Sequence, residues 1–240
     1  MQKRKIQHYR LIGLDIFRGW AILLMIVYHF SYDLNHFRII HINMDHEPFW
    51  VYARYVIVTM FLLSVGISLA LVHTPMIQWQ KIRKRTLLLG GASLLVSLAT
   101  YIEFPHTWVY FGVLHFILVT SWLGLLFLPY PLLTLLTALF IFLASAMGWL
   151  HMHGLFSLLQ SPLHLPPTYT EDIVRLFPWF GVVLIGIIFV SYNIHIKLFK
   201  NIFFSPSAIP NKILAFSGRH ALIIYLLHLP ILFGLVSFFR

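Results

Sequence analysis

LDIFRGWAILLMIVYHFSYD, residues 14–33, is the stretch that decides the fold. It is long and apolar enough to cross a bilayer, because about 20 mainly apolar residues span the hydrocarbon core as a helix. It nevertheless carries Asp15, Arg18, His29 and Asp33. Ionisable side chains inside a spanning helix are costly and usually have a function. The stretch therefore predicts a first membrane span that contributes to a functional site.

The spacing of these four side chains predicts that they share one helix face. Each residue of an α-helix advances about 100°, so the steps from Arg18 to His29 return to within about 20° of the starting direction. Asp33 lies one turn beyond His29, and Asp15 lies one turn before Arg18. Such a face must turn toward protein or a water-filled cavity. For Arg18 alone, the alternative is that its side chain reaches the lipid head groups.

Composition places the whole chain among integral membrane proteins. The 240 residues have a mean hydropathy of +0.84, and only 10% of them are charged, whereas a soluble domain carries about 25% charged residues. The absence of cysteine excludes disulfides, thiolate metal sites and cysteine nucleophiles. The chain contains no P-loop, GxSxG or dinucleotide-binding motif. We expect one transmembrane domain over residues 1–240.

Seven segments qualify as spans of an all-α helix bundle, and prolines, which disfavour helix continuation, separate them. The first ten residues resemble the start of a signal peptide, but the following segment is too long and too polar on one face, so we expect a retained span. The predicted spans are residues 12–33, 49–72, 85–104, 107–128, 131–149, 175–194 and 217–238.

Basic residues predict the orientation of these spans. Twelve lysines and arginines fall in the loops of one side and three in the loops of the other, and the richer side is the cytoplasmic one. This predicts a cytoplasmic N-terminus and an external C-terminus, for a plasma or inner membrane. The net charge of +10 is thereby explained by topology, and no nucleic-acid partner is expected.

Two stretches outside the spans have their own predictions. The external loop 150–174 is expected to hold a short interfacial helix around Leu155 to Leu159, and residues 195–204 are expected to lie along the membrane surface. Several external histidines, including the HMH sequence at 151–153, raise the alternative of a zinc site. Their spacing does not match that of a helical zinc site, so we expect solvated histidines and no metal.

Polar side chains in later spans are further candidates. Arg54, near the outer boundary of the second span, either reaches the head groups or contacts an anion or carbonyl near His29. His115 in the fourth span either hydrogen-bonds a neighbouring helix or lines the cavity, and we favour the cavity. Tyr225 and His228 are three residues apart in the last span, so they share a face.

Five segments, in order, resemble the bacterial relatives of the heparan-α-glucosaminide N-acetyltransferase catalytic domain: LDIFRGWAILLMIVYHFSYDL, FLLSVGISL, FGVLH, LFPWFGVVLIG and GRHALIIYLLHLPIL. The spacing of Arg18 and His29 is also similar to the motif of the acyltransferase-3 membrane family. The resemblance implies transfer of an acetyl group from acetyl-CoA to an acceptor across a membrane, with His29 as the catalytic residue. The chain lacks the additional spans of the lysosomal enzyme, so the acceptor stays open.

Acetyl transfer from a thioester needs a base, an oxyanion stabiliser and a site for CoA. His29 fits the base because imidazole titrates near neutral pH, or it carries the acetyl group as an acyl-imidazole. Asp33 is expected to fix the tautomer of His29. Donors to the oxyanion are sought among Arg54, Tyr225 and His228. The full set expected to bind acetyl-CoA is Arg18, Arg54, His115, Arg219, Tyr225 and His228, with Lys81–Arg85 and Arg219 as contacts to the CoA phosphates.

A different class of function stays open from the residues alone. Buried His, Asp and Arg in seven spans also suit a proton-coupled transporter or flippase, although no inverted repeat is present. A membrane scaffold would leave the polar face of the first span unexplained. The expected partners are membrane lipids, acetyl-CoA, a glycan or glycolipid acceptor, most simply a sugar, and a second copy in a homodimer.

Overall fold

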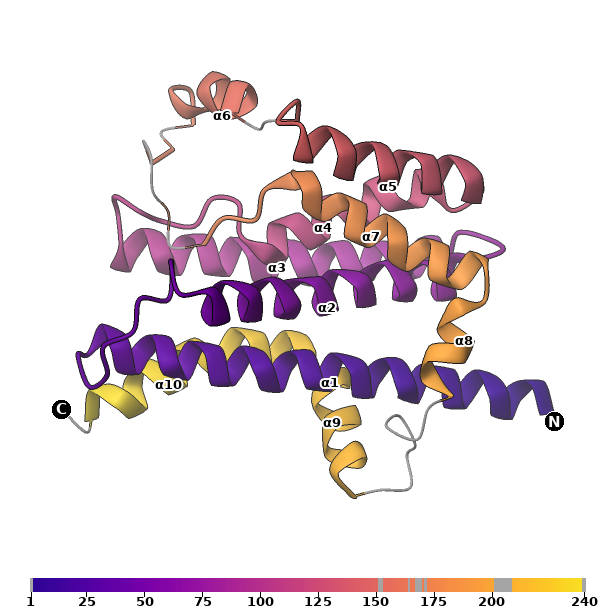
Figure 1. The fold of residues 1–240 in the computed structure, drawn as a ribbon, viewed down its shortest axis with the longest axis horizontal. Helices are drawn as coiled ribbons and strands as arrows, with labels where there is room; N and C mark the ends of the chain where they lie inside the picture. Colours follow the sequence, from indigo (N-terminus) through magenta and orange to yellow (C-terminus); the bar gives the residue numbers. More distant parts are fainter. Residues whose placement is uncertain are drawn as a thin grey trace. The chain divides into compact units, whose positions relative to one another are not determined.

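In the computed structural model, residues 2–150, 153–163, 165–166, 170, 172–200 and 209–238 are described. Regular structure in these residues is helical (Figure 1), apart from an isolated bridge between Phe111 and Ile173. The helices are α1 (Gln2–His36), α2 (Pro48–His73), α3 (Trp79–Glu103), α4 (Val113–Phe127), α5 (Pro131–Ala146), α6 (His153–Gln160), α7 (Leu176–Ser191), α8 (Ile194–Phe199), α9 (Ile209–Arg219) and α10 (Ala221–Phe238).

Each of the seven predicted spans contains an apolar helix, which confirms the all-α membrane bundle. Four of these helices are long and apolar enough to cross a membrane, namely α1 from Ile12 onward, α2, α3 and α10. The other three, α4, α5 and α7, are apolar but have only 15 or 16 residues. At 1.5 Å per residue they are shorter than the roughly 30 Å hydrocarbon core.

Several predicted boundaries differ from the helix ends by several residues; α3, for example, begins at Trp79 and not at 85. Helix α4 begins at Val113 and not near 107, because Gly112 is extended (φ −82°, ψ −173°) and Asp172 accepts the first backbone N–H of the helix. The predicted last span, 217–238, joins two helices, because a turn at His220 separates α9 from α10.

The structure tests one of the two loop predictions, that of a short helix in 150–174. The short helix expected around Leu155 to Leu159 is α6, and α8 covers the first part of 195–204. Residues 201–204 lie outside the described part of the chain, as do His151 and His164 of the zinc alternative. Among the described residues, no group of three or more His, Asp or Glu side chains is arranged to hold a metal ion.

The chain forms two compact units. The first comprises residues 1–64 and 193–240. In it, α1 packs against α8, α9 and α10, and Figure 1 shows α10 along α1. The ring of His29 meets that of His228, and the ring of His36 meets that of Phe233. The residue numbers of α1 and α10 rise in the same direction along this contact, so the two helices run parallel. This agrees with the predicted topology, in which the first and seventh spans cross the membrane in the same direction.

The second unit comprises residues 65–192. In it, α5 packs against α7, and α4 packs against α3, α5 and α7. Glycine permits the closest contacts, because a Cβ at Gly66 would overlap the carbonyl oxygen of Val183. The segments that precede α4 and α7 run parallel to each other where Phe111 and Ile173 form the isolated bridge.

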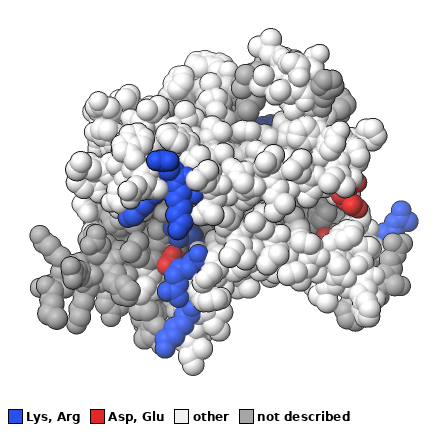
Figure 2. Space-filling model, turned by 180° about the vertical axis from the view of Figure 1, so that it is seen from behind, with Lys and Arg blue, Asp and Glu red and all other residues white. Residues whose placement is uncertain are grey.

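Exposed surface on the helices is strongly apolar. On α3, for example, Leu87 is 76% exposed and Ile102 is 78% exposed. Figure 2 shows Lys, Arg, Asp and Glu at only a few places on the face in view, with most of that face uncharged. A surface of this kind would be costly in water, and it is the surface that lipid tails solvate.

Candidate active site

The candidate site lies in the first unit, where α1 and α10 meet. The imidazole rings of His29 and His228 contact each other edge to face, with centroids 4.8 Å apart and an interplanar angle of 79°. Tyr225 lies beside them, with its ring centroid 5.5 Å from that of His228. His228 is buried, and His29 is partly exposed. Three of the residues predicted from the sequence are therefore brought together.

Hydrogen bonds define the tautomers of the two histidines. Nδ1 of His29 donates to the carbonyl oxygen of Met25 at 2.9 Å, and Nδ1 of His228 donates to that of Tyr225 at 2.6 Å. A carbonyl oxygen can only accept, so each neutral ring carries its proton on Nδ1 and a lone pair on Nε2. The Nε2 of His29 is therefore placed to take a proton. The neutral His228 cannot donate to an oxyanion through Nε2, contrary to one of the roles that the sequence suggested.

Asp33 does not occupy the position expected of it. Nδ1 of His29 donates its proton to the Met25 carbonyl oxygen. The Asp33 carboxylate therefore does not fix the tautomer of His29. Asp33 is only 4% exposed, and in the described part of the chain its Oδ2 has no hydrogen-bond partner. The helix supplies its own carbonyl four residues before His29, a local contact that side-chain spacing alone does not reveal.

Arg54 lies next to the site through Tyr28. Its guanidinium acts on Tyr28 electrostatically and lies 3.5 Å from a carboxylate oxygen of Asp45. The ring centroid of Tyr28 is 5.7 Å from that of His29 and 5.9 Å from that of Trp50. Arg54 thus interacts with the residue that precedes His29, with a side chain still 43% exposed.

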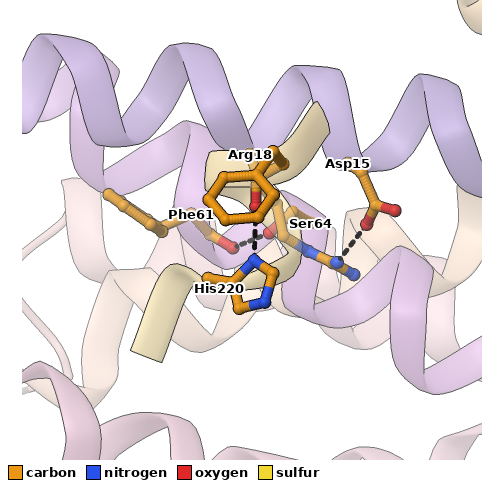
Figure 3. A network of polar contacts seen from close by, with 6 residues as sticks. Asp15, Arg18, Phe61, Ser64 and His220 are labelled. Atoms are coloured by element: carbon orange, nitrogen blue, oxygen red, sulfur yellow. Dashed lines mark hydrogen bonds and ion pairs between the residues drawn. The ribbon is translucent and has the colours of Figure 1, made fainter. Parts of the chain in front are cut away.

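A second group of charges lies nearer the start of the α1 span. Arg18 and Asp15 form an ion pair with 2.9 Å between Nη1 and Oδ1, which Figure 3 shows together with a hydrogen bond of Ser64 on α2 and one of His220 after α9. Arg219 of α9 also acts on Asp15 electrostatically. Asp15 thus interacts with both arginines.

Two glycines let α9 approach α1 closely enough for this arrangement. A Cβ at Gly19 would overlap the backbone carbonyl of Leu214, and a Cβ at Gly218 would overlap that of Asp15. Helix α9 and these contacts were not predicted from the sequence. The signal was present in the pairs Arg18-Gly19 and Gly218-Arg219, because a glycine beside a charged residue inside an apolar helix is a sign of close backbone packing.

His115 belongs to the second unit and has a hydrogen-bonded partner there. The hydroxyl of Ser97 on α3 donates to the carbonyl oxygen of Val109 at 2.7 Å, and it lies 3.2 Å from Nε2 of His115. Since the single hydroxyl proton is used by Val109, Nε2 of His115 is the donor to Ser97. Of the two expectations for His115, the structure shows the hydrogen bond to a neighbouring helix, α3. Of the basic group Lys81–Arg85 in the same unit, Arg85 donates from Nε to the Ser121 hydroxyl at 3.0 Å.

Asp172 is a polar residue of the second unit that the sequence did not single out for a role. Its Oδ2 accepts the backbone N–H of Val113 at 3.1 Å and so caps the start of α4, where a negative charge also meets the positive end of the helix dipole. The adjacent Thr170 hydroxyl donates to the carbonyl oxygen of Trp108 at 2.9 Å. Burial raises the pKa of the Asp172 carboxyl.

Comparison with known proteins gives one match. Residues 10–230 match the family described as heparan-alpha-glucosaminide N-acetyltransferase, catalytic. No curated protein and no solved structure matches the chain. The matched residues include α1 from Arg10 onward, α10 up to Pro230 with the site between these helices, all of the second unit and most of the first. The chain therefore belongs to the heparan-alpha-glucosaminide N-acetyltransferase catalytic domain family.

Proposed function

We propose that this membrane acetyltransferase moves an acetyl group from cytosolic acetyl-CoA to an acceptor on the other side of the membrane, with His29 as the catalytic residue. The family supports an acetyltransferase of the N-acetyltransferase type. We add three points to what the family supports: acetyl-CoA as the donor, transfer from the cytosolic to the opposite side, and a catalytic role for His29. The acceptor that we expect is a sugar of a glycan or glycolipid, and the membrane that we expect is a bacterial inner membrane.

The observation that carries the proposal is the state of the His29 ring. Its Nδ1 proton is held by the Met25 carbonyl, so the lone pair of Nε2 is available, and the ring is partly exposed. His228 packs against it edge to face at 4.8 Å and restricts its orientation. An imidazole with one nitrogen bonded and the other unprotonated is the arrangement that general-base catalysis requires.

The transfer is a substitution at the thioester carbonyl. The acceptor atom attacks the carbonyl carbon while Nε2 of His29 takes its proton. The C–S bond then breaks, and the leaving CoA thiolate takes the proton from the His29 imidazolium. The products are the acetylated acceptor and CoA with a free thiol, so no oxidant or reductant is needed.

A second route uses His29 as the acetyl carrier. Its Nε2 attacks the thioester, the C–S bond breaks, and CoA leaves as the thiolate. The acceptor then attacks the acetyl-imidazole, and the acceptor proton is released as the N–C bond breaks. Incubation of the protein with acetyl-CoA in the absence of acceptor distinguishes the routes, because only the second leaves an acetyl group on His29.

The tetrahedral intermediate needs a hydrogen-bond donor for its oxyanion. The Tyr225 hydroxyl and the Arg54 guanidinium are the groups that we assign to this role, since the neutral His228 has no proton to offer at Nε2. Removal of one such donor in other enzymes costs about 10²–10³ in kcat. Both residues lie near the histidine pair, Tyr225 through His228 and Arg54 through Tyr28.

The CoA phosphates need cations at the cytoplasmic end. Arg18 and Arg219, which both interact with Asp15, are the residues of the first unit that we assign to this contact. Arg18 lies roughly 16 Å before His29 along α1, at 1.5 Å per residue. The pantetheine arm of CoA is an extended chain, and a span of this order separates its phosphates from its thioester.

Ligand binding separates this proposal from transport. Detergent-purified protein is warmed with and without CoA, and the same protein is placed in liposomes for uptake assays. The proposal predicts a higher melting temperature with CoA and release of CoA from acetyl-CoA when acceptor is added. Solute uptake by liposomes without CoA, combined with no stabilisation by CoA, would identify a carrier instead.

A further inference from the structure

The second route for acetyl transfer leaves His29 without a nitrogen that can take a proton. Its Nε2 carries the acetyl group in that route, and its Nδ1 keeps the proton that it donates to the carbonyl oxygen of Met25 at 2.9 Å. The acetylated ring is therefore a cation with no free lone pair on nitrogen. Because the acceptor must lose a proton as it attacks, this route requires a second base beside His29.

Among the described residues, the rings of Tyr28 and His228 contact the ring of His29, and one of them is such a base. The centroid distances to His29 are 5.7 Å from Tyr28 and 4.8 Å from His228. A phenol keeps its proton at neutral pH, whereas an imidazole titrates close to it. Since Nδ1 of His228 donates to the carbonyl oxygen of Tyr225 at 2.6 Å, the lone pair of the neutral ring is on Nε2.

This Nε2 of His228 is buried and has no partner of its own in the described part of the chain. The side chain is only 5% exposed, and the nitrogen makes no hydrogen bond there. Buried polar atoms are paired in the great majority of cases, because an unpaired one costs free energy. An open hydrogen-bond acceptor beside a reacting ring is explained if the substrate supplies the donor. The acceptor, which brings an N–H or O–H to His29, is such a donor.

We propose that His228 is a second catalytic residue, the base that takes the proton of the acceptor when the acceptor attacks acetylated His29. The inference rests on the proposed function and selects its second route. The two histidines then have different roles. Nε2 of His29 forms and breaks the bond to the acetyl carbon, and Nε2 of His228 takes up and releases the proton, directly or through one water.

The two steps balance in atoms and charge. Nε2 of His29 attacks the thioester carbonyl carbon, the C–S bond breaks, and its electron pair leaves with CoA as the thiolate. The acceptor then attacks the same carbon, its proton passes to Nε2 of His228, and the bond from that carbon to His29 breaks. His29 leaves as the neutral ring, with its Nδ1 proton still bonded to Met25. The His228 imidazolium loses its proton to solvent, and the CoA thiolate gains one.

Rapid mixing measures the two half-reactions separately. The full-length protein is first mixed with acetyl-CoA labelled in the acetyl group, and the release of CoA and the label on His29 are followed. Glucosamine, glucose or water alone then discharges the acetyl group. His228→Gln keeps a polar side chain but has no basic nitrogen. We expect it to acetylate His29 at close to the wild-type rate and to discharge the acetyl group about 10²–10⁴-fold more slowly, so that acetyl-His29 accumulates.

A positioning role for His228 makes a different prediction, because a misplaced His29 would slow both half-reactions alike. His36→Gln is the matched control, since it removes an exposed imidazole of α1 whose ring contacts Phe233 of α10. It should leave both half-reactions at the wild-type rate. Hydroxylamine attacks an acyl-imidazole before it loses a proton, so it should discharge the wild-type protein and His228→Gln at similar rates.

The wild-type protein alone can overturn the inference. If no label is found on His29 and CoA is released only with acceptor, transfer is direct, and the proposed function stands without a second base. Equal losses in the two half-reactions of His228→Gln, or discharge at the wild-type rate, overturn it as well. Stabilisation by CoA shows that the variant is folded, and His228→Asn replaces it if it is not stabilised. No release of CoA from the wild-type protein under any of these conditions would count against the proposed function itself.

Discussion

Gly218 of α9 lies directly against the backbone carbonyl of Asp15 on α1, so close that a Cβ at residue 218 would overlap that oxygen. The contact explains how Arg219 comes to act on the Asp15–Arg18 ion pair. The close approach of α9 to α1 is made at glycines, and the chain turns at His220 before α10 begins.

Gly218→Ala should lower the stability of the protein. The new methyl group meets backbone atoms that cannot rotate away, and overpacking of this kind costs about 1–3 kcal/mol. The melting temperature in detergent measures the effect. Gly91→Ala is the control, because no atom lies within 4 Å of a Cβ there and alanine is the better helix former. Equal melting temperatures for the two variants would contradict the contact.

Arg18→Ala should weaken the binding of acetyl-CoA. Loss of a charged contact to a phosphate costs about 1.5–3 kcal/mol, so the KM for acetyl-CoA should rise about tenfold or more. The acceptor KM should stay the same, because the proposed acceptor site beside His29 is at the other end of α1. An unchanged affinity for acetyl-CoA would favour the alternative, in which the Arg18 side chain contacts lipid head groups.

Ser97→Ala should reduce stability and leave acetyl transfer intact. The substitution removes the acceptor of the His115 Nε2–H, and an unpaired donor of this kind costs about 1–3 kcal/mol. The melting temperature and the rate of CoA release are measured on the same sample. Lost activity at an unchanged melting temperature would instead assign His115 to the binding of acetyl-CoA.

Asp172→Asn should flatten the dependence of stability on pH. Because burial raises the pKa of this carboxyl in the folded protein, the folded state favours the protonated form. The stability that this preference contributes is present below the ordinary Asp pKa of about 3.9 and is lost as the pH rises through the raised value. Melting temperatures of the wild-type protein and the variant across this range provide the measurement. Parallel curves would show that Asp172 does not titrate differently in the folded state.

The sequence predicted the helices because hydropathy and loop charge are strong signals in a membrane protein. It also named His29, His228 and Tyr225 as candidate site residues, since each lies on a polar stripe of an otherwise apolar span. It did not predict α9, whose boundary with α10 depends on a close backbone contact. It assigned Asp33 to the tautomer of His29, although the helix supplies the Met25 carbonyl for that purpose. Contacts of side chains with backbone depend on local geometry, which residue spacing does not specify.

The rate of acetyl transfer by His29→Ala tests the central claim most directly. The wild-type protein, His29→Ala and His36→Ala are purified, and their binding of CoA is checked. Release of CoA in the presence of acceptor is then measured for each. His36 is an exposed histidine on the same face of α1, so its substitution controls for the loss of an imidazole. We predict that His29→Ala binds CoA but loses at least the 10²–10⁴-fold that a general base typically supplies, while His36→Ala keeps its activity. Transfer by His29→Ala at the wild-type rate would contradict the account.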